Sequence, residues 1–189
     1  MNVIQTRLPG VLVIEPRIFR DDRGYFLETW SAATYGAKGL PTVFAQDNLS
    51  CSSVGVLRGL HYQFPTGQGK LVGVALGKVY DVAVDIRVGS PTFGQWEAVI
   101  LSAEDGRQLY IPPGFAHGFF VIGDEPALFS YKCTEAYDPT GQCSILWDDP
   151  EIGIEWPGSR PALSPKDADA PRLRDIPESR LPRHRPGST

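Results

Sequence analysis

The chain has 189 residues, of which 42% are hydrophobic and 21% are charged, and its formal net charge is -4. These values are those of one globular domain with a sizeable core, and they exclude a disordered or fibrous chain. A mildly acidic chain lacks the positive charge needed to bind bulk nucleic acid or an anionic membrane, and no apolar stretch approaches the roughly 20 residues that span a bilayer.

Short runs rich in β-branched and aromatic residues follow one another along the chain, bounded by Gly, Pro, Asp and Ser. This pattern predicts an all-β sandwich or jelly roll. Gly77-Lys78 predicts a hairpin between two of the runs, and helices are expected only at residues 31–36 and after Ser164. The expected strands are 10–19, 24–30, 43–47, 56–64, 71–76, 79–86, 96–101, 109–111, 119–122, 127–133 and 145–147.

The composition changes after Trp156, where prolines recur and large apolar residues become scarce. We therefore expect a single domain over residues 1–170 and a flexible Pro- and Arg-rich tail over residues 171–189.

The three cysteines, Cys51, Cys133 and Cys143, cannot all pair within the chain, and their spacing suits no zinc site. The N-terminus lacks the basic region and apolar run of a signal peptide. Free thiols without an export signal predict a cytoplasmic protein.

Two of the three histidines lie in Gly-flanked β segments. The segment Pro112-x-Gly114-x-x-His117 resembles the second half of the cupin motif, but the first half reads His61-Tyr62-Gln63 and is one histidine short. A catalytic first-row metal usually has three protein ligands. The sequence therefore predicts no metal, although a metal-dependent cupin enzyme remains an alternative.

Polar side chains surround these histidines in the expected sheet. Lys70 alone would be a solvated strand end, and Tyr131 alone a half-buried strand aromatic. Taken together with a histidine they supply a base, a cation and a weak acid, which is a set suited to proton transfer.

Seven segments in chain order, between about Val11 and Asp167, resemble the dTDP-4-dehydrorhamnose 3,5-epimerase family. The resemblance implies a cupin-type jelly roll, which is a double-stranded β-helix sandwich with short peripheral helices. It also implies a homodimer with exchanged N-terminal strands that uses no metal and no cofactor. The matching segments are DDRGYFLE (21–28), QDNLS (46–50), GVLRGLHYQ (55–63), GKLV (69–72), DVAVDIRVGSPTFG (81–94), IPPGFAHGF (111–119) and WDDP (147–150).

The implied activity is inversion of C3 and C5 of dTDP-4-dehydro-6-deoxy-D-glucose, which gives dTDP-4-dehydro-L-rhamnose. The C4 ketone acidifies the hydrogens on both carbons, because loss of either proton gives an enolate. By resemblance, His61 is the base, Tyr131 is the acid on the far face of the ring, and Lys70 holds O4.

Asp167 has two interpretations. By resemblance its carboxylate hydrogen-bonds His61 and fixes the tautomer of that ring. The run Ser164-Pro165-Lys166-Asp167 also predicts a helix start, in which the carboxylate would serve the cap. The family match favours the contact with His61.

The resemblance also implies a substrate-binding set, in which arginines suit a diphosphate and Tyr137 stacks on the thymine. Gln142 stands where the family often has Glu. The set comprises Arg23, Phe26, Glu28, Gln46, Asp47, Asn48, Arg58, His117, Tyr137, Gln142 and Lys166.

Arg58 and His61 are three residues apart, so regular strand alternation would place them on opposite faces. If both face one pocket, Gly59 must mark a bulge.

Two further alternatives remain open. The first is a 3-epimerase, a 5-epimerase or a ketoisomerase that acts on the same nucleotide sugar. The second is a non-catalytic sugar-binding jelly roll.

Overall fold

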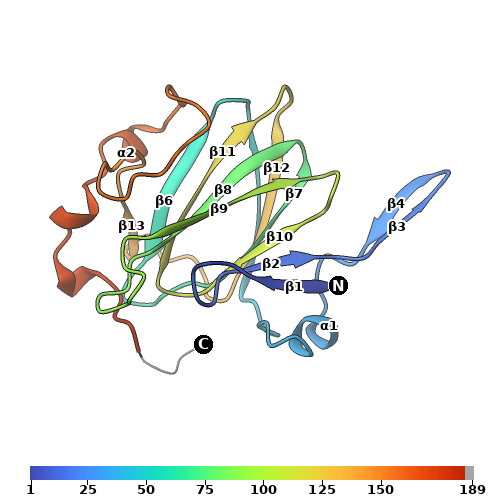
Figure 1. Cartoon of the computed structure of the whole chain (residues 1–189), viewed down its shortest axis with the longest axis horizontal. Coiled ribbons are helices and arrows are strands. Elements are labelled where there is room, and N and C mark those ends of the chain that lie inside the picture. The colour runs from blue at the N-terminus through green and yellow to red at the C-terminus, as the bar shows by residue number, and fades with distance from the viewer. Residues whose placement is uncertain (186–189) are drawn as a thin grey trace.

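Two antiparallel β-sheets pack face to face and form the body of the molecule in a computed structural model that describes residues 1–185 (Figure 1). The first sheet has the order β1-β2-β10-β7-β12-β5, and the second has the order β13-β6-β11-β8-β9. Strands adjacent in space are often distant in sequence, as in a jelly roll. The predicted all-β fold class is confirmed.

The strands of the two sheets are short. The first sheet contains β1 (Asn2–Gln5), β2 (Leu12–Glu15), β5 (Gln46–Ser52), β7 (Lys70–Leu76), β10 (Gln108–Ile111) and β12 (Ala127–Cys133). The second contains β6 (Leu57–Gln63), β8 (Lys78–Asp85), β9 (Trp96–Ser102), β11 (Phe115–Ile122) and β13 (Gln142–Ser144).

A separate hairpin of β3 (Ile18–Asp21) and β4 (Gly24–Leu27) projects away from the body (Figure 1). The predicted strand 10–19 is therefore two strands, β2 and β3, which are separated at Pro16. Proline cannot donate to a strand ladder, so it accounts for the break.

The predicted hairpin at Gly77-Lys78 is wrong. The chain passes there from β7 in the first sheet to β8 in the second. Gly77 has a φ of +74°, and a Cβ at this position would lie 2.4 Å from the carbonyl oxygen of Pro126. Gly77 thus permits a crossing between sheets, a role that a two-residue turn pattern does not distinguish from a hairpin.

Two strands were displaced in the sequence prediction. β5 covers Gln46–Ser52 rather than 43–47, and β13 covers Gln142–Ser144 rather than 145–147. β5 carries polar residues on both faces, and β13 has only three residues, so neither shows the sustained alternation of apolar and polar residues that marks a half-buried strand. The mostly exposed β1 was missed for the same reason.

The core has three parts: one between the sheets, one on the outer face of the second sheet, and one where Tyr35 packs with Ile14 and Leu71 of the first sheet. Between the sheets, Phe119 and Phe129 stack with ring centroids 4.2 Å apart. On the outer face, Leu173 and Leu181 pack with Val82 and Val84. These contacts attach the two 3₁₀ turns at Leu173–Asp175 and Glu178–Arg180 to the domain.

Residues 171–185 are thus in contact with the sheet, although the sequence prediction placed them in a flexible tail. Residues 186–189, the rest of that predicted tail, lie outside the described residues. The domain boundary at residue 170 stays a prediction.

Both predicted helices are confirmed. Helix α1 (Ala32–Gly36) has Ser31 as its N-cap, and α2 (Pro165–Ala168) has Ser164 as its N-cap with Pro165 in the first turn. Over residues 1–185, none of the helices has the length and apolar character needed to cross a membrane.

Candidate active site

A cavity of about 690 Å³ opens between the two sheets. Strands β5, β7 and β12 line one side, β6 and β11 line the other, and residues near α2 close one end. It brings together most of the side chains that the sequence singled out for catalysis or binding. These are His61, Lys70, Tyr131, Asp167, Gln46, Asn48, Arg58, His117, Tyr137, Gln142 and Lys166.

A bulge in β6 allows Arg58 and His61 to face this cavity together. His117 pairs with His61 and Phe119 pairs with Arg58, so two steps along β11 correspond to three along β6. Gly59 has a φ of +133°, and a Cβ there would lie 2.5 Å from the Cα of Gly118. The predicted bulge is confirmed, and only glycine suits its position.

His61 and Asp167 form a close pair in the cavity wall. The Nε2 atom of His61 lies 2.6 Å from Oδ1 of Asp167, whose side chain is 5% exposed. The backbone N–H of Asp167 meanwhile donates to Oγ of Ser164 at 3.2 Å. The predicted helix start and the contact with His61 therefore coexist, because the main chain of Asp167 takes part in the helix cap while its carboxylate holds the histidine.

The surroundings of Asp167 keep its carboxylate charged. Burial alone would raise the pKa of Asp167, but hydrogen bonds from His61 and Ser164 outweigh it, and the pKa is lowered. With Nε2 of His61 engaged by an anion, Nδ1 is the ring nitrogen left to exchange a proton with a ligand.

A second histidine–aspartate pair lies beside the first. Nε2 of His117 lies 3.1 and 2.9 Å from the two carboxylate oxygens of Asp81, a fully buried residue of β8. Burial lowers the pKa of His117, although Asp81 opposes the shift, so the ring is neutral at pH 7. Sequence reasoning missed Asp81, whose signal is a lone carboxylate in the apolar run of a central strand.

Lys70 and Tyr131 complete the polar interior. Burial lowers the pKa of Lys70, and it raises the pKa of the Tyr131 hydroxyl. Lys70 forms no ion pair within residues 1–185, so its charge is available to an anion in the cavity. Tyr131 stays protonated at neutral pH and can donate a proton.

A hydrogen-bonded chain forms the outer end of the cavity. The Tyr137 amide donates to Oε1 of Gln46 at 2.8 Å, and Nε2 of Gln46 donates to Oδ1 of Asn48 at 2.8 Å. The hydroxyl of Tyr137 donates to the side-chain oxygen of Gln142. Gln142 thus fixes the orientation of an aromatic ring at the cavity mouth.

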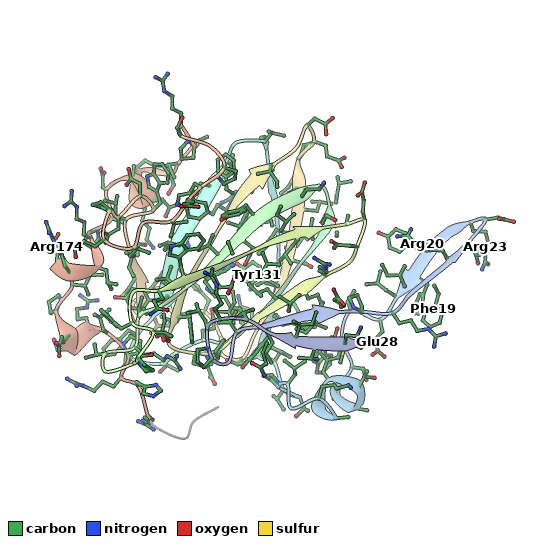
Figure 2. The ribbon with its side chains drawn as sticks, in the orientation of Figure 1. Phe19, Arg20, Arg23, Glu28, Tyr131 and Arg174 are labelled. Carbon is green, nitrogen blue, oxygen red and sulfur yellow. The ribbon has the colours of Figure 1, made fainter. Side chains whose placement is uncertain are left out.

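Four of the predicted binding residues lie outside the cavity of this chain. The carboxylate of Asp47 accepts two hydrogen bonds from Lys132, at 2.8 and 3.0 Å, on the outer face of β5. Arg23 pairs with Asp21 at the hairpin tip, and Phe26 is 69% exposed. Figure 2 shows Arg23 and Glu28 well apart from Tyr131.

The metal-ligand types are dispersed over the part of the chain that the structure describes. No group of three His, Cys, Asp or Glu side chains in residues 1–185 is arranged to hold an ion. Nε2 of His61 and Nε2 of His117 each contact an aspartate.

A β-sandwich whose interior presents a histidine–aspartate pair, a lysine and a tyrosine defines an isomerase of the proton-transfer class. The family model of dTDP-4-dehydrorhamnose 3,5-epimerase matches residues 5–175. The chain belongs to the dTDP-4-dehydrorhamnose 3,5-epimerase family.

Several relatives match over nearly their whole lengths. The dTDP-4-dehydrorhamnose 3,5-epimerase of Shigella flexneri is 52% identical over 93% of this chain and 97% of its own. A crystal structure of dTDP-6-deoxy-D-glucose-3,5-epimerase from Legionella pneumophila, in complex with dTDP-4-keto-L-rhamnose, superposes with a TM-score of 0.94 at 52% identity. That match covers 97% of this chain and 98% of the other.

A relative described as a 3'-monoepimerase, from Streptomyces bikiniensis in complex with dTDP-quinovose, has a TM-score of 0.87 at 36% identity. The match covers 94% of this chain and 91% of the other. The fold therefore accommodates single as well as double epimerisation.

Proposed function

We propose that the enzyme inverts C3 and C5 of dTDP-4-dehydro-6-deoxy-D-glucose and produces dTDP-4-dehydro-L-rhamnose. One observation carries the proposal: the base and the acid come from opposite walls. His61 lies on β6 of the second sheet, and Tyr131 lies on β12 of the first. Inversion of a carbon needs a proton removed from one face and returned to the other, and this arrangement supplies both.

In the first half of each inversion, Nδ1 of His61 removes the proton α to the C4 ketone. Asp167 stabilises the imidazolium that forms, because its carboxylate already accepts from Nε2. The negative charge moves to O4, where the ammonium group of Lys70, on the cavity wall, stabilises it.

In the second half, the hydroxyl of Tyr131 returns a proton to the opposite face of the ring. His117 is neutral and donates from Nε2 to the Asp81 carboxylate, so its Nδ1 can accept a hydrogen bond from a sugar hydroxyl. His61 then releases the proton it took up, and Tyr131 regains one, both by exchange with solvent. Repeating the sequence at the second carbon gives the doubly inverted sugar.

The nucleotide occupies the outer end in this proposal. Tyr137 offers a ring for stacking on the thymine, and Arg58 and Lys166 offer positive charge to the diphosphate. Gln46, Asn48 and Gln142 supply amide groups for the base and ribose.

We further propose a homodimer in which the β3–β4 hairpin of one subunit completes the pocket of the other. Phe19, Tyr25 and Phe26 are 49, 50 and 69% exposed on a hairpin that leaves the body, and such aromatic exposure needs a partner (Figure 2). Arg23 and Glu28 would then reach a nucleotide that they cannot reach in their own subunit.

Mixing two inactive variants tests this arrangement. In a heterodimer of Arg23→Ala and His61→Ala subunits, the pocket with an intact His61 receives the intact hairpin. We expect activity to return on mixing. If hairpin and cavity act in the same subunit, mixed dimers stay inactive.

The reaction itself is tested by incubation with dTDP-4-dehydro-6-deoxy-D-glucose in deuterated water. Double epimerisation predicts deuterium at both C3 and C5 of an L-configured product. Label at one carbon would show a single epimerase, label with a migrated carbonyl would show a ketoisomerase, and binding without label would show a sugar-binding protein.

Metal independence is part of the proposal, and so is a cytoplasmic location. The first rests on two histidines whose Nε2 atoms contact aspartates. The second rests on the free thiols of Cys51, Cys133 and Cys143.

A further inference from the structure

A buried serine holds the arginine that lines the cavity. Nε of Arg58 donates to Oγ of Ser52 at 2.9 Å. Ser52 is 4% exposed and ends β5, where its backbone pairs with Ala127 of β12. The acceptor is therefore fixed by the first sheet, while the donor belongs to β6 of the second.

The partner of Arg58 is neutral, whereas the partners of Arg87 and Arg7 are carboxylates. Arg87 donates from Nε and Nη2 to the two oxygens of Asp85, at 2.9 and 2.7 Å, and Arg7 donates to Glu97. Arg58 forms no ion pair with any of residues 1–185. A serine hydroxyl orients the guanidinium through Nε and leaves its positive charge uncompensated.

This geometry suits recognition of a dianion. An arginine binds phosphate best through a planar fork of parallel N–H groups. With Nε held by Ser52, the two Nη groups are free to donate into the cavity. Pre-ordering the side chain also lowers the entropy cost of binding, because a free arginine carries about 2 kcal/mol of rotamer entropy.

We propose that Ser52 is a positioning residue that fixes the guanidinium of Arg58 for the diphosphate of the nucleotide. This inference rests on the proposed function. Ser52 does not line the cavity, so it acts through Arg58 and not by touching the substrate.

The test is a double-mutant cycle read by binding of dTDP and of thymidine to the full-length enzyme. We expect Ser52→Ala to weaken dTDP binding roughly 5- to 20-fold, because the guanidinium keeps its charge and loses only part of its pre-ordering. Thymidine has no phosphate, so its binding should not change. In an Arg58→Ala background, Ser52→Ala should have less than about a twofold effect.

Kinetics separate positioning from a structural role. Ser52→Ala should raise KM with kcat nearly unchanged, because the group lost binds substrate and transition state alike. Ser52→Thr retains the oxygen and should restore affinity, whereas Ser52→Cys keeps the shape with a poor acceptor and should not. Ser130→Ala, on the exposed face of β12, is the matched control and should bind dTDP normally.

Two results are decisive against the assignment. Wild-type affinity in Ser52→Ala would overturn it, and so would an equal loss in the presence and absence of Arg58. If the wild-type enzyme itself does not bind dTDP, the proposed function is wrong. This outcome differs from one in which the wild-type enzyme binds dTDP and Ser52→Ala binds it equally well.

Discussion

His61 and Asp167 are 106 residues apart in sequence, yet Nε2 of one lies 2.6 Å from Oδ1 of the other. The contact depends on the four-residue helix α2, which begins at Pro165 and points its third residue at β6. A short capped turn thus fixes the orientation of the proposed base.

Asp167→Asn should lower kcat while leaving dTDP binding intact. An amide can present its N–H₂ to the ring and stabilise the wrong tautomer, so we expect a loss of roughly 10²-fold or more. Single-turnover kinetics together with calorimetric dTDP binding measure the two effects. A normal kcat would show that the carboxylate serves only the helix cap and has no role in catalysis.

Tyr131→Phe should separate proton removal from proton return. Phenylalanine keeps the ring but lacks the hydroxyl, so His61 still abstracts and Lys70 still holds the enolate. We expect early exchange of substrate hydrogens with deuterated water to survive better than formation of the inverted sugar. Tyr110→Phe, outside the cavity, is the control, and wild-type product formation by Tyr131→Phe would show that another group donates.

Chelation should not abolish activity. His61 and His117 are committed to Asp167 and Asp81, and two histidines do not complete a catalytic metal site. Elemental analysis of the purified enzyme and an activity assay after prolonged EDTA treatment test this prediction. Loss of activity that zinc or iron restores would favour a metal-dependent enzyme.

Asp85 should contribute stability that depends on pH. Burial raises its pKa, but bonds from Arg87, Ser90 and Thr92 outweigh burial, and the pKa is lowered. A carboxyl whose folded pKa is lowered stabilises the fold above its unfolded pKa of about 3.9, and the stabilisation disappears as the pH falls through the folded value.

Asp85→Asn should therefore lower the free energy of unfolding by about 2–4 kcal/mol at pH 7. The difference from wild type should be smaller at an acidic pH below the lowered pKa of Asp85, where the wild-type carboxyl is protonated. Urea denaturation at both pH values measures the difference in the free energy of unfolding between Asp85→Asn and wild type. If this difference is the same at both pH values, the charge of Asp85 does not contribute to stability.

The sequence predicted the all-β class because strands such as β8 and β12 carry apolar residues bounded by turn residues. It displaced β5 because Gln46, Asn48 and Ser50 face the cavity, and a polar inner face removes the apolar alternation. The sequence wrongly predicted a hairpin at Gly77, because a turn pattern does not indicate whether the next strand joins the same sheet or the other one.

The candidate site was predictable wherever short motifs carry it, as at His61 and His117. Asp81 and Ser52 were missed because their roles arise from contacts between strands, with His117 on β11 and with Arg58 on β6. The single sequence also does not show whether Arg23 and Glu28 act in their own subunit, since such binding depends on assembly.

The most direct test of the account is His61→Ala, assayed for turnover and for dTDP binding on the same preparation. We expect turnover to fall by roughly 10²- to 10⁴-fold or more, the range for loss of a general base, with dTDP affinity nearly unchanged. His184→Ala, which alters a histidine outside the cavity, should behave as wild type. Near-normal turnover in His61→Ala would contradict the proposed mechanism.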